Sequence, residues 1–390
     1  MKTYKYKIQS HKRNRHLLSD TRIISQVHNH FVALTRRHYR IFGQSEGYRR
    51  ASYNRLSRHL TKLKGLEKYA HWRIPYSWAL QECLRRLDLG YINFLEGRAK
   101  RPPKFKSWRN YRSMTFDGKQ VEIQQVCDKS YKQRRVPVSK IRLNGRWYRC
   151  WYSREIQGNI NRVTVKRDAL GDWYISVLTD DEGLDPEPKT GDAAGFDYGN
   201  KTFLTCSDGT KYESPEFYKQ SVKKVKQANR QLSKKVRGSN NRKRASKHSA
   251  RTHRKIQRQR EDYHWKLALE IVRKFDISFF EDLNLNGMKR LWGRKVSDLA
   301  FGAFMLKMKW QSKKRGKRVE TIGRWEATTP ICHSCGQRHL FIDLSVREWY
   351  CQSCKTGHDR DVNAAINILK VGTSTFGVEG VRLAIASVPC

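Results

Sequence analysis

The spacing of apolar residues changes twice within the first half of the chain. Residues 1–9 alternate between apolar and charged positions, which predicts a β-strand with one buried face. Between residues 19 and 95 the apolar residues recur every three or four positions, which predicts amphipathic helices with Ser19 or Asp20 as the first N-cap. Residues 113–180 return to short alternating runs separated by turns, and we expect these strands and the first one to form a small β-barrel.

The second half of the chain combines single strands with helices and follows a linker. Residues 183–190 contain two prolines and mark this linker. Apolar runs predict strands at 193–198, 201–206 and 277–280, and helical spacing predicts a last helix at 361–369.

Composition narrows the class of protein. The 390 residues suffice for two or three domains, and 38% hydrophobic residues suffice for packed cores. The chain carries 81 Lys and Arg against 36 Asp and Glu, a net charge of +45, which favours a partner with a phosphate backbone. No apolar stretch approaches the about 20 residues that span a bilayer, and the charged N-terminus does not resemble a secretory signal. We expect a cytoplasmic, nucleoid-associated protein without a membrane partner.

One segment concentrates the positive charge. Residues 219–260 hold 17 Lys or Arg and neither Asp nor Glu. The sequence is compatible with a long helix, a helical hairpin or a disordered arm. Because no acid balances the charge, we expect contact with nucleic-acid phosphates rather than a merely solvated surface. The candidate contacts are Lys223, Lys224, Arg230, Lys234, Lys235, Arg242 and Arg244.

Three acidic residues stand at the edges of apolar runs. Asp197 and Glu281 each end a predicted strand, and Asp361 opens the last predicted helix. Taken singly, they could be a turn former, a surface charge and a helix N-cap. Taken together, they could converge on one point. Asp359 competes with Asp361, and we expect Asp359 to cap the helix while Asp361 points inward.

Carboxylates that converge need a counterion. Two of them 4 Å apart repel by roughly 4 kcal/mol at intermediate dielectric. Hard divalent cations prefer oxygen ligands, and two Mg²⁺ or Mn²⁺ ions would relieve the repulsion, activate a water and stabilise the leaving oxygen of a phosphodiester. The pattern therefore predicts a metal-dependent nuclease.

Four of the nine cysteines form a motif. Cys332, Cys335, Cys351 and Cys354 have the spacing C-x₂-C-x₁₅-C-x₂-C, in which two Cys pairs bind one tetrahedral Zn²⁺ ion. Four thiolates leave no open position for a substrate, so we expect a structural zinc ion. His333 and His358 are surplus candidate ligands. The other cysteines are scattered, which argues against a disulfide framework and for a reducing compartment.

The motifs together resemble the TnpB family, transposon-encoded RNA-guided DNA endonucleases related to the type V CRISPR effectors. The segments that carry the resemblance are Gly195–Gly199, Glu281–Leu283, Cys332–Cys354 and Asp359–Ala365, supported by Arg101–Ser107 and Val163–Tyr174. One departure is Lys355-Thr356-Gly357 after the last cysteine, where a glycine often comes sooner, and this puts the loop in question.

The resemblance implies an α+β multidomain protein whose nuclease domain is RNase H-like and RuvC-type, with Asp197, Glu281 and Asp361 as its metal-binding acids. The implied domains are a wedge β-barrel (1–9 and 101–185), a helical recognition lobe (10–100), the RuvC domain (191–329 and 357–390) and a zinc ribbon (330–356).

The resemblance also implies a guide RNA and a double-stranded DNA target next to a short motif, bound by a monomer. By analogy Tyr76, Ser77 and Gln81 are candidates to recognise that motif, although Ser77 could simply be an N-cap. Lys104 and Lys106 are further candidate nucleic-acid contacts. The alternatives are a nuclease-inactive RNA-guided DNA-binding repressor, or a non-catalytic RNA-binding protein that would leave the three acids unexplained. No tyrosine or serine nucleophile set supports a strand-transferring transposase.

Overall fold

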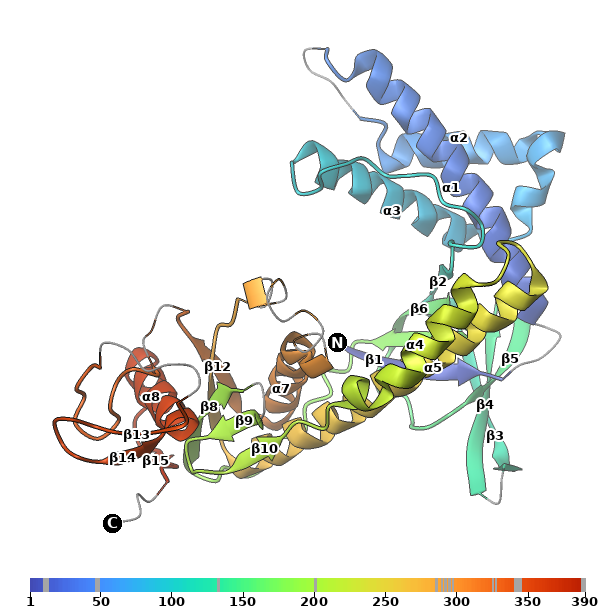
Figure 1. The fold of residues 1–390 in the computed structure, drawn as a ribbon. Coiled ribbons are helices and arrows are strands. Elements are labelled where there is room, and N and C mark those ends of the chain that lie inside the picture. Colours follow the sequence, from blue (N-terminus) through green and yellow to red (C-terminus); the bar gives the residue numbers. More distant parts are fainter. Residues whose placement is uncertain are drawn as a thin grey trace. The chain divides into compact units, whose positions relative to one another are not determined.

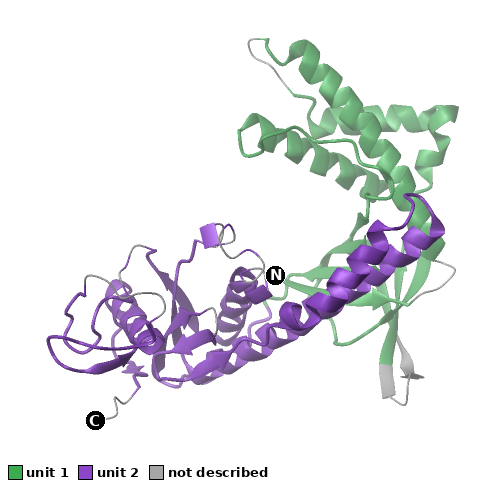
Figure 2. Cartoon of the chain, in the orientation of Figure 1, with its two compact units in different colours: residues 1–182 green, residues 183–390 purple. Residues whose placement is uncertain are grey.

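The chain forms two compact units, residues 1–182 and 183–390 (Figure 2). The computed structural model describes all residues except the following: 10–13, 46–49, 132–133, 200–201, 285–286, 289, 291–292, 294–295, 297, 325, 327, 340–345 and 387–390. The boundary between the units falls at the start of the predicted linker.

Unit 1 is built on a seven-stranded sheet with the order β2-β6-β7-β1-β5-β4-β3 (Figure 1). Its strands are β1 (Lys2–Ile8), β2 (Ser113–Asp117), β3 (Glu122–Tyr131), β4 (Arg134–Leu143), β5 (Arg146–Trp151), β6 (Ile160–Arg167) and β7 (Trp173–Thr179). All neighbours are antiparallel, and β1 lies between β5 and β7, which confirms that the N-terminal strand joins this sheet. The described pairings leave β2 and β3 as its edges.

Helices complete unit 1. They are α1 (Asn14–Phe42), α2 (Tyr53–Gly65), the 3₁₀-helix η1 (Glu67–Arg73) and α3 (Ser77–Leu95). A second, short 3₁₀-helix, η2 (Gly118–Gln120), follows β2. The predicted N-cap is wrong, because α1 starts at Asn14 and Asp20 is buried within it. Leu17 is only 1% exposed, so the apolar face of the helix extends further toward the N-terminus than the spacing indicated.

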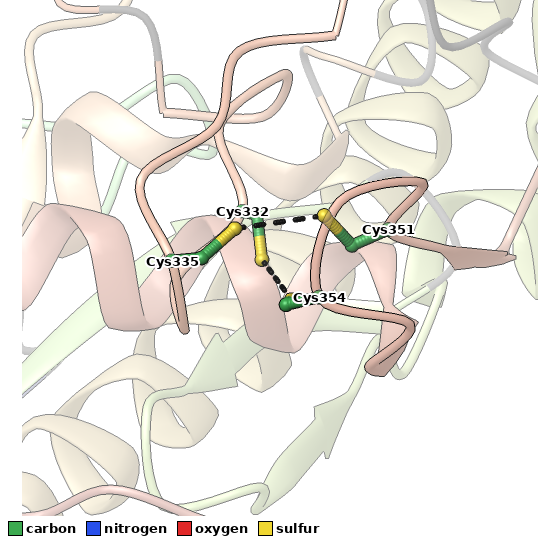
Figure 3. Close-up of side chains that lie close together, drawn as sticks. All are labelled: Cys332, Cys335, Cys351 and Cys354. Atoms are coloured by element: carbon green, nitrogen blue, oxygen red, sulfur yellow. Dashed lines mark hydrogen bonds between the residues drawn. The ribbon is translucent and has the colours of Figure 1, made fainter.

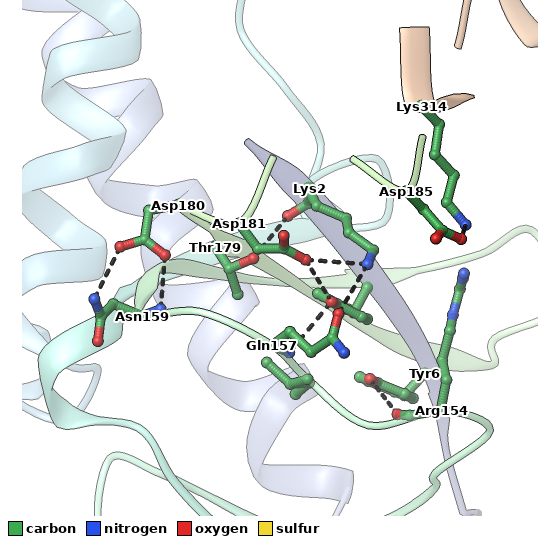
Figure 4. Close-up of polar contacts among 12 residues, drawn as sticks. Lys2, Tyr6, Arg154, Gln157, Asn159, Thr179, Asp180, Asp181, Asp185 and Lys314 are labelled. Carbon is green, nitrogen blue, oxygen red and sulfur yellow. Dashed lines mark hydrogen bonds and ion pairs between the residues drawn. The ribbon is translucent and has the colours of Figure 1, made fainter. Parts of the chain in front are cut away.

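Hydrogen bonds and ion pairs hold the C-terminal end of unit 1 in place (Figure 4). Asp181 accepts hydrogen bonds from Lys2 and from the Tyr4 hydroxyl, both at 3.0 Å. Asp180 accepts two bonds from Asn159, one from the backbone N–H at 2.7 Å and one from the side chain at 2.9 Å. The last residues before the linker are thereby fixed to the sheet.

Unit 2 contains a six-stranded sheet with the order β10-β9-β8-β11-β12, and β15 pairs with the start of β8. The strands are β8 (Asp192–Tyr198), β9 (Thr202–Cys206), β10 (Lys211–Glu213), β11 (Ile277–Glu281), β12 (Arg318–Ile322) and β15 (Arg382–Leu383). The three strands β8, β11 and β12 are parallel.

The helices described in unit 2 are α4 (Phe217–Ser233), α5 (Asn240–Lys274), α7 (Phe301–Arg315) and α8 (Arg360–Thr375). Helices α5, α7 and α8 pack against the two faces of the sheet, whereas α4 pairs with α5. Phe196 and Phe280 pack with α5 and α7 on one face, whereas Phe279 packs with Ile368 of α8 on the other. Because side chains alternate along a strand, Gly195, Asp197 and Glu281 belong to the α8 face.

The basic segment forms a helical hairpin, α4 and α5, and this outcome selects one of the alternatives left open by the sequence. The second helix of the hairpin, α5, runs without interruption from Asn240 to Lys274. Val225 and Ile256 are buried within this hairpin, so its few aliphatic residues hold the two helices together.

The linker contacts the C-terminal end of α7. The backbone N–H of Asp185 donates to the carbonyl of Lys314 at 2.7 Å, and Asp185 also forms an ion pair with the Lys314 ammonium at 3.3 Å (Figure 4). Glu187 accepts a hydrogen bond at 2.8 Å from Arg315, which is 6% exposed. Among the described residues, no helix has the length and apolar composition needed to cross a membrane.

Candidate nuclease and zinc sites

Asp197 and Glu281 occupy equivalent ends of neighbouring parallel strands. Phe280 of β11 lies opposite Phe196 of β8. The next residue of each strand, Glu281 and Asp197, therefore lies at the same end of the two parallel strands, their carboxyl end. Both are half-buried. In the sequence each acid directly follows a run of apolar residues. Because these apolar residues are buried in the core, they determine the position of the carboxylate at the end of the strand.

Asp361 approaches the same edge from α8. A Cβ atom on Gly195 would overlap the carbonyl oxygen of Ala365, so α8 lies directly against β8. Asp359 is the N-cap and accepts hydrogen bonds at 3.0 Å from the N–H groups of Asp361 and Val362. The expected division of roles between Asp359 and Asp361 is thus confirmed for the cap.

The electrostatics connect the three acids. Burial, followed by the negative charges of Asp361 and Glu281, raises the pKa of Asp197 to about 8, and the nearby charge of Arg360 opposes this rise. Burial and then Asp282 raise the pKa of Glu281. Arg347 contacts both oxygens of Asp361 at 3.4 Å. The site therefore concentrates negative charge that a cation would stabilise.

The carboxylates do not lie as close together as the cysteines. Among the described residues, Cys332, Cys335, Cys351 and Cys354 are the group of His, Cys, Asp or Glu whose ligand atoms all lie within 4.8 Å of one another. The three acids form no such group.

The four sulfur atoms have a spacing that suits one zinc ion (Figure 3). The Sγ atoms of Cys332 and Cys354 are 3.6 Å apart, and those of Cys335 and Cys351 are also 3.6 Å apart. A tetrahedron with Zn–S bonds of about 2.3 Å has sulfur atoms about 3.8 Å apart. A disulfide requires about 2.05 Å, so the cysteines form a metal-type cluster rather than two bridges.

The two Cys-x-x-Cys loops repeat one backbone pattern. Gly336 N–H donates to the Cys332 carbonyl and Lys355 N–H to the Cys351 carbonyl, both at 2.9 Å. Both residues have positive φ, 78° for Gly336 and 58° for Lys355. The missing glycine noted in the sequence therefore leaves the loop intact, but it forces a lysine into a conformation that glycine adopts more easily.

Two asparagines of α8 connect the zinc loop to the helix that carries Asp361, and sequence reasoning missed them. Asn363 donates to the Ile331 carbonyl at 2.8 Å and accepts from the His333 N–H at 2.9 Å. Asn367, one turn further on, donates to the same carbonyl at 2.7 Å. Both are at least nine-tenths buried. Their position on the apolar face of the last helix was the available signal, because buried amides need partners.

Neither surplus histidine belongs to the close cysteine group. The Nε2 atom of His358 lies 3.1 Å from the Cys332 sulfur, and the ring packs between His333 and Trp349. Burial lowers the pKa of His358 to about 4, so the ring is neutral near pH 7. A neutral ring can donate one hydrogen bond to a thiolate.

The candidate nucleic-acid residues differ in their surroundings. Six side chains of the basic hairpin are exposed: Lys223, Lys224, Arg230, Lys234, Lys235 and Arg244. Arg242 instead donates to the carbonyls of Leu232 and Lys235, at 3.0 and 2.8 Å, and holds the turn between the helices. Its guanidinium therefore has a structural role in this hairpin.

The candidates in unit 1 lie on α3 and after it. Tyr76 donates to Gln120 and stacks on Phe116, with ring centroids 5.7 Å apart. Tyr76 occupies the N-cap position of α3, and the exposed Ser77 accepts a hydrogen bond from Lys64 instead of capping the helix. Gln81 lies one turn further along and is half-buried. Lys104 and Lys106 are exposed.

The fold and the two sites define a mixed α/β protein that has acidic strand ends and a four-cysteine cluster. Residues 165–291 match the OrfB_IS605 family, described as a probable transposase, and residues 301–368 match the Cas12f1-like TNB domain. A Streptomyces pristinaespiralis protein named "Putative RNA-guided DNA endonuclease" is 31% identical over 347 residues, 86% of this chain and 81% of the relative. The chain belongs to this family, the TnpB family.

Further comparisons agree with this assignment. The Escherichia coli K12 protein named "Putative RNA-guided DNA endonuclease InsQ" is 28% identical over 336 residues, 82% of this chain and 80% of the relative. The cryo-EM structure of the Cas12f1-sgRNA-target DNA complex contains a chain with a TM-score of 0.53 and 13% identity. The match covers 92% of this chain and 83% of that chain, and it supports the overall fold.

Proposed function

We propose that this protein is an RNA-guided DNA endonuclease that hydrolyses phosphodiester bonds in double-stranded DNA matched by its guide RNA. The observation that carries the proposal is the alignment of 86% of the chain with a relative of that name. In such enzymes base pairing recognises the sequence, while the protein binds backbone and helix shape. A net charge of +45 suits this division of roles.

Asp197, Glu281 and Asp361 would hold the catalytic cations. Their oxygen atoms match the ligand preference of Mg²⁺ and Mn²⁺, and the raised pKa of Asp197 fits a site that gains its stability from cation binding. When bound, such cations activate a water and stabilise the leaving oxygen of the phosphodiester. The strand ends and α8 orient the carboxylates, and Asp359 fixes the first turn of that helix.

The finer architecture is also proposed by family likeness. Unit 2 would contain the RuvC-like domain (191–329 and 357–390), and parallel strands that end in carboxylates support it. The zinc ribbon (330–356) would be folded by one structural Zn²⁺ ion. The sheet of unit 1, with residues 1–9 and 101–185, would form the wedge barrel, and residues 10–100 the recognition lobe.

The partners follow from the same proposal. The exposed cations of the α4–α5 hairpin would contact RNA phosphates, and Tyr76, Ser77 and Gln81 would lie near the adjacent DNA motif. The ribonucleoprotein would contain one copy of the chain and act in the cytoplasm on nucleoid DNA.

The test is a cleavage assay with the full-length protein and its copurifying RNA. Asp197→Ala should abolish cleavage of matched DNA in Mg²⁺ and leave RNA binding unchanged. Asp208→Ala is the matched control, because Asp208 lies in the turn that follows β9 and pairs with Lys274 at 2.6 Å. Cleavage by Asp197→Ala would reject the assigned acids. Guided DNA binding without cleavage by the wild type would support the nuclease-inactive repressor instead.

A further inference from the structure

Unit 1 contains a basic pocket that lies outside the nuclease and zinc sites. The cavity has a volume of about 360 Å³ and lies between α3 and the extended segment 99–113. Gly90 of α3 allows the segment to come close, because a Cβ atom there would be only 2.9 Å from the Cγ atom of Pro103. The buried Cys83 and Tyr111 form part of its wall.

The backbone that borders the pocket is held in place by side chains of α1. Arg36 donates to the Pro103 carbonyl at 3.0 Å, and His28 contacts the Lys104 carbonyl at 3.1 Å. The Lys106 carbonyl accepts bonds from two further α1 side chains, Ser25 and Asn29, at 3.0 and 2.9 Å. The segment is therefore built before any ligand binds, while its own basic side chains remain exposed.

The lining of the pocket is strongly cationic. Its positively charged residues are Arg86, Arg101, Lys104, Lys106 and Arg112, and its lining includes no Asp or Glu. Arg86 pairs with Glu82 at 3.4 Å, and Glu82 also pairs with Arg85 at 3.7 Å. No carboxylate of the described part of the chain forms an ion pair with the other four. Clustered charge of one sign within a concave site favours an anionic ligand.

Two exposed aromatic rings belong to the same segment as the lining residues. Phe105 is 54% exposed and lies under the Arg36 guanidinium, 4.9 Å from the ring centroid. Trp108 is 37% exposed and has a guanidinium near its face at 5.3 Å. Aromatic faces next to a cationic groove are the usual stacking surface for unpaired bases.

We propose that this pocket binds one unpaired nucleotide of the guide RNA, with its phosphate held by Arg101, Lys104 and Arg112. A neighbouring base would stack on Phe105 or Trp108. RNA fits better than DNA because Asn93 and Asn110 also line the pocket, and an amide can both donate to and accept from a 2′-hydroxyl. The inference rests on the proposed function, which supplies the RNA.

The test is hydroxyl-radical footprinting of the copurifying RNA on the full-length protein. The double variant Arg101→Gln/Arg112→Gln should expose a run of one or two nucleotides that the wild type protects. It should also weaken RNA binding about ten-fold at physiological salt and reduce the slope of log K against log[salt] by about 0.7 per lost phosphate contact. Lys62→Gln, an exposed lysine of α2 outside the pocket, should leave that run protected.

Each outcome has a distinct meaning. The variants must melt at the wild-type temperature, because the substituted side chains are exposed and form no ion pair with any residue that the structure describes. A footprint and salt slope unchanged by the double variant would overturn the pocket assignment. Loss of the RNA footprint in the double variant, with Mn²⁺ binding intact, would support the pocket. If the wild-type protein shows the footprint but does not cleave DNA, the proposed function is wrong and the pocket assignment still holds.

Discussion

Gly195 of β8 and Ala365 of α8 are in such close contact that a Cβ atom on Gly195 would overlap the Ala365 carbonyl oxygen. The same added atom would also crowd the backbone N of Leu369. Since Asp197 lies two residues beyond Gly195 and Asp361 one turn before Ala365, this contact sets the separation between two of the candidate ligands.

Gly195→Ala should therefore displace α8 and destabilise unit 2 by about 1–3 kcal/mol, the usual cost of overpacking against rigid neighbours. Urea unfolding measures the loss, and Mn²⁺ titration should show weaker binding. Gly65→Ala is the control, because nothing lies within 4 Å of a Cβ atom there. Wild-type stability of Gly195→Ala would show that α8 is not in close contact with β8.

Lys355→Gly should stabilise the zinc loop. Lys355 has a φ of 58°, and a glycine there removes the steric cost of the left-handed conformation, about 1–2 kcal/mol. Zinc transfer to a chromogenic chelator should be slower than in the wild type. The reverse change, Gly336→Lys in the first loop, should accelerate transfer. Equal rates of zinc transfer in the wild type and the two variants would contradict the claim that the backbone is strained at Lys355.

Asn363→Ala should uncouple the zinc loop from α8. It removes the bonds to Ile331 and His333 and should cost about 1–3 kcal/mol, because buried polar groups lose their partner. Asn367→Ala removes a bond to the same carbonyl one turn farther from Asp361. We expect both variants to lose zinc faster, but only Asn363→Ala to weaken Mn²⁺ binding several-fold. Equal Mn²⁺ affinities for the two variants would contradict the coupling.

Asp197→Asn should stabilise the protein in magnesium-free buffer. The pKa of Asp197 is raised to about 8 by burial and by the neighbouring acids. A raised folded-state pKa means that stability is lost as pH increases from about 4, where the unfolded carboxyl ionises, to about 8. The variant should thus match the wild type near pH 4 and exceed it by on the order of 1–3 kcal/mol at pH 8.

Chemical unfolding at several pH values checks this prediction, with zinc retained by avoiding chelators. Added Mg²⁺ should reverse the order by stabilising only the wild type. Asp180→Asn is the control, because hydrogen bonds from Asn159 lower the pKa of Asp180 and the substitution removes a favourable charge. A stability difference between Asp197→Asn and the wild type that does not depend on pH would mean that Asp197 has an ordinary pKa.

Local patterns predicted most of the elements in unit 2. The strands of 193–198 and 277–280 appear as β8 and β11, because short apolar runs bounded by polar turns leave few alternatives. The cysteine spacing predicted the four-cysteine cluster in the same way, because two Cys-x-x-Cys pairs together supply the four thiolates that one zinc ion binds. The start of α1 was missed because Leu17 is buried in a tertiary core that also contains residues far away in the sequence, such as Tyr148.

The relation between the acids could be inferred only in part. Strand alternation places Asp197 and Glu281 on one face, but the approach of α8 depends on the missing side chain of Gly195. The contacts of Asn363 with Ile331 join segments 32 residues apart, and no local pattern specifies such a bond. The sequence likewise left three alternatives for the basic segment, because helix propensity alone does not show whether charged helices pair.

The central claim is that Asp197, Glu281 and Asp361 bind divalent metal together. The most direct measurement is a Mn²⁺ titration followed by electron paramagnetic resonance on the zinc-loaded protein and on Asp197→Asn, Glu281→Gln and Asp361→Asn. We expect tight binding in the wild type and a loss of at least ten-fold in affinity in each variant. Wild-type affinity in any one of the three variants would contradict the account.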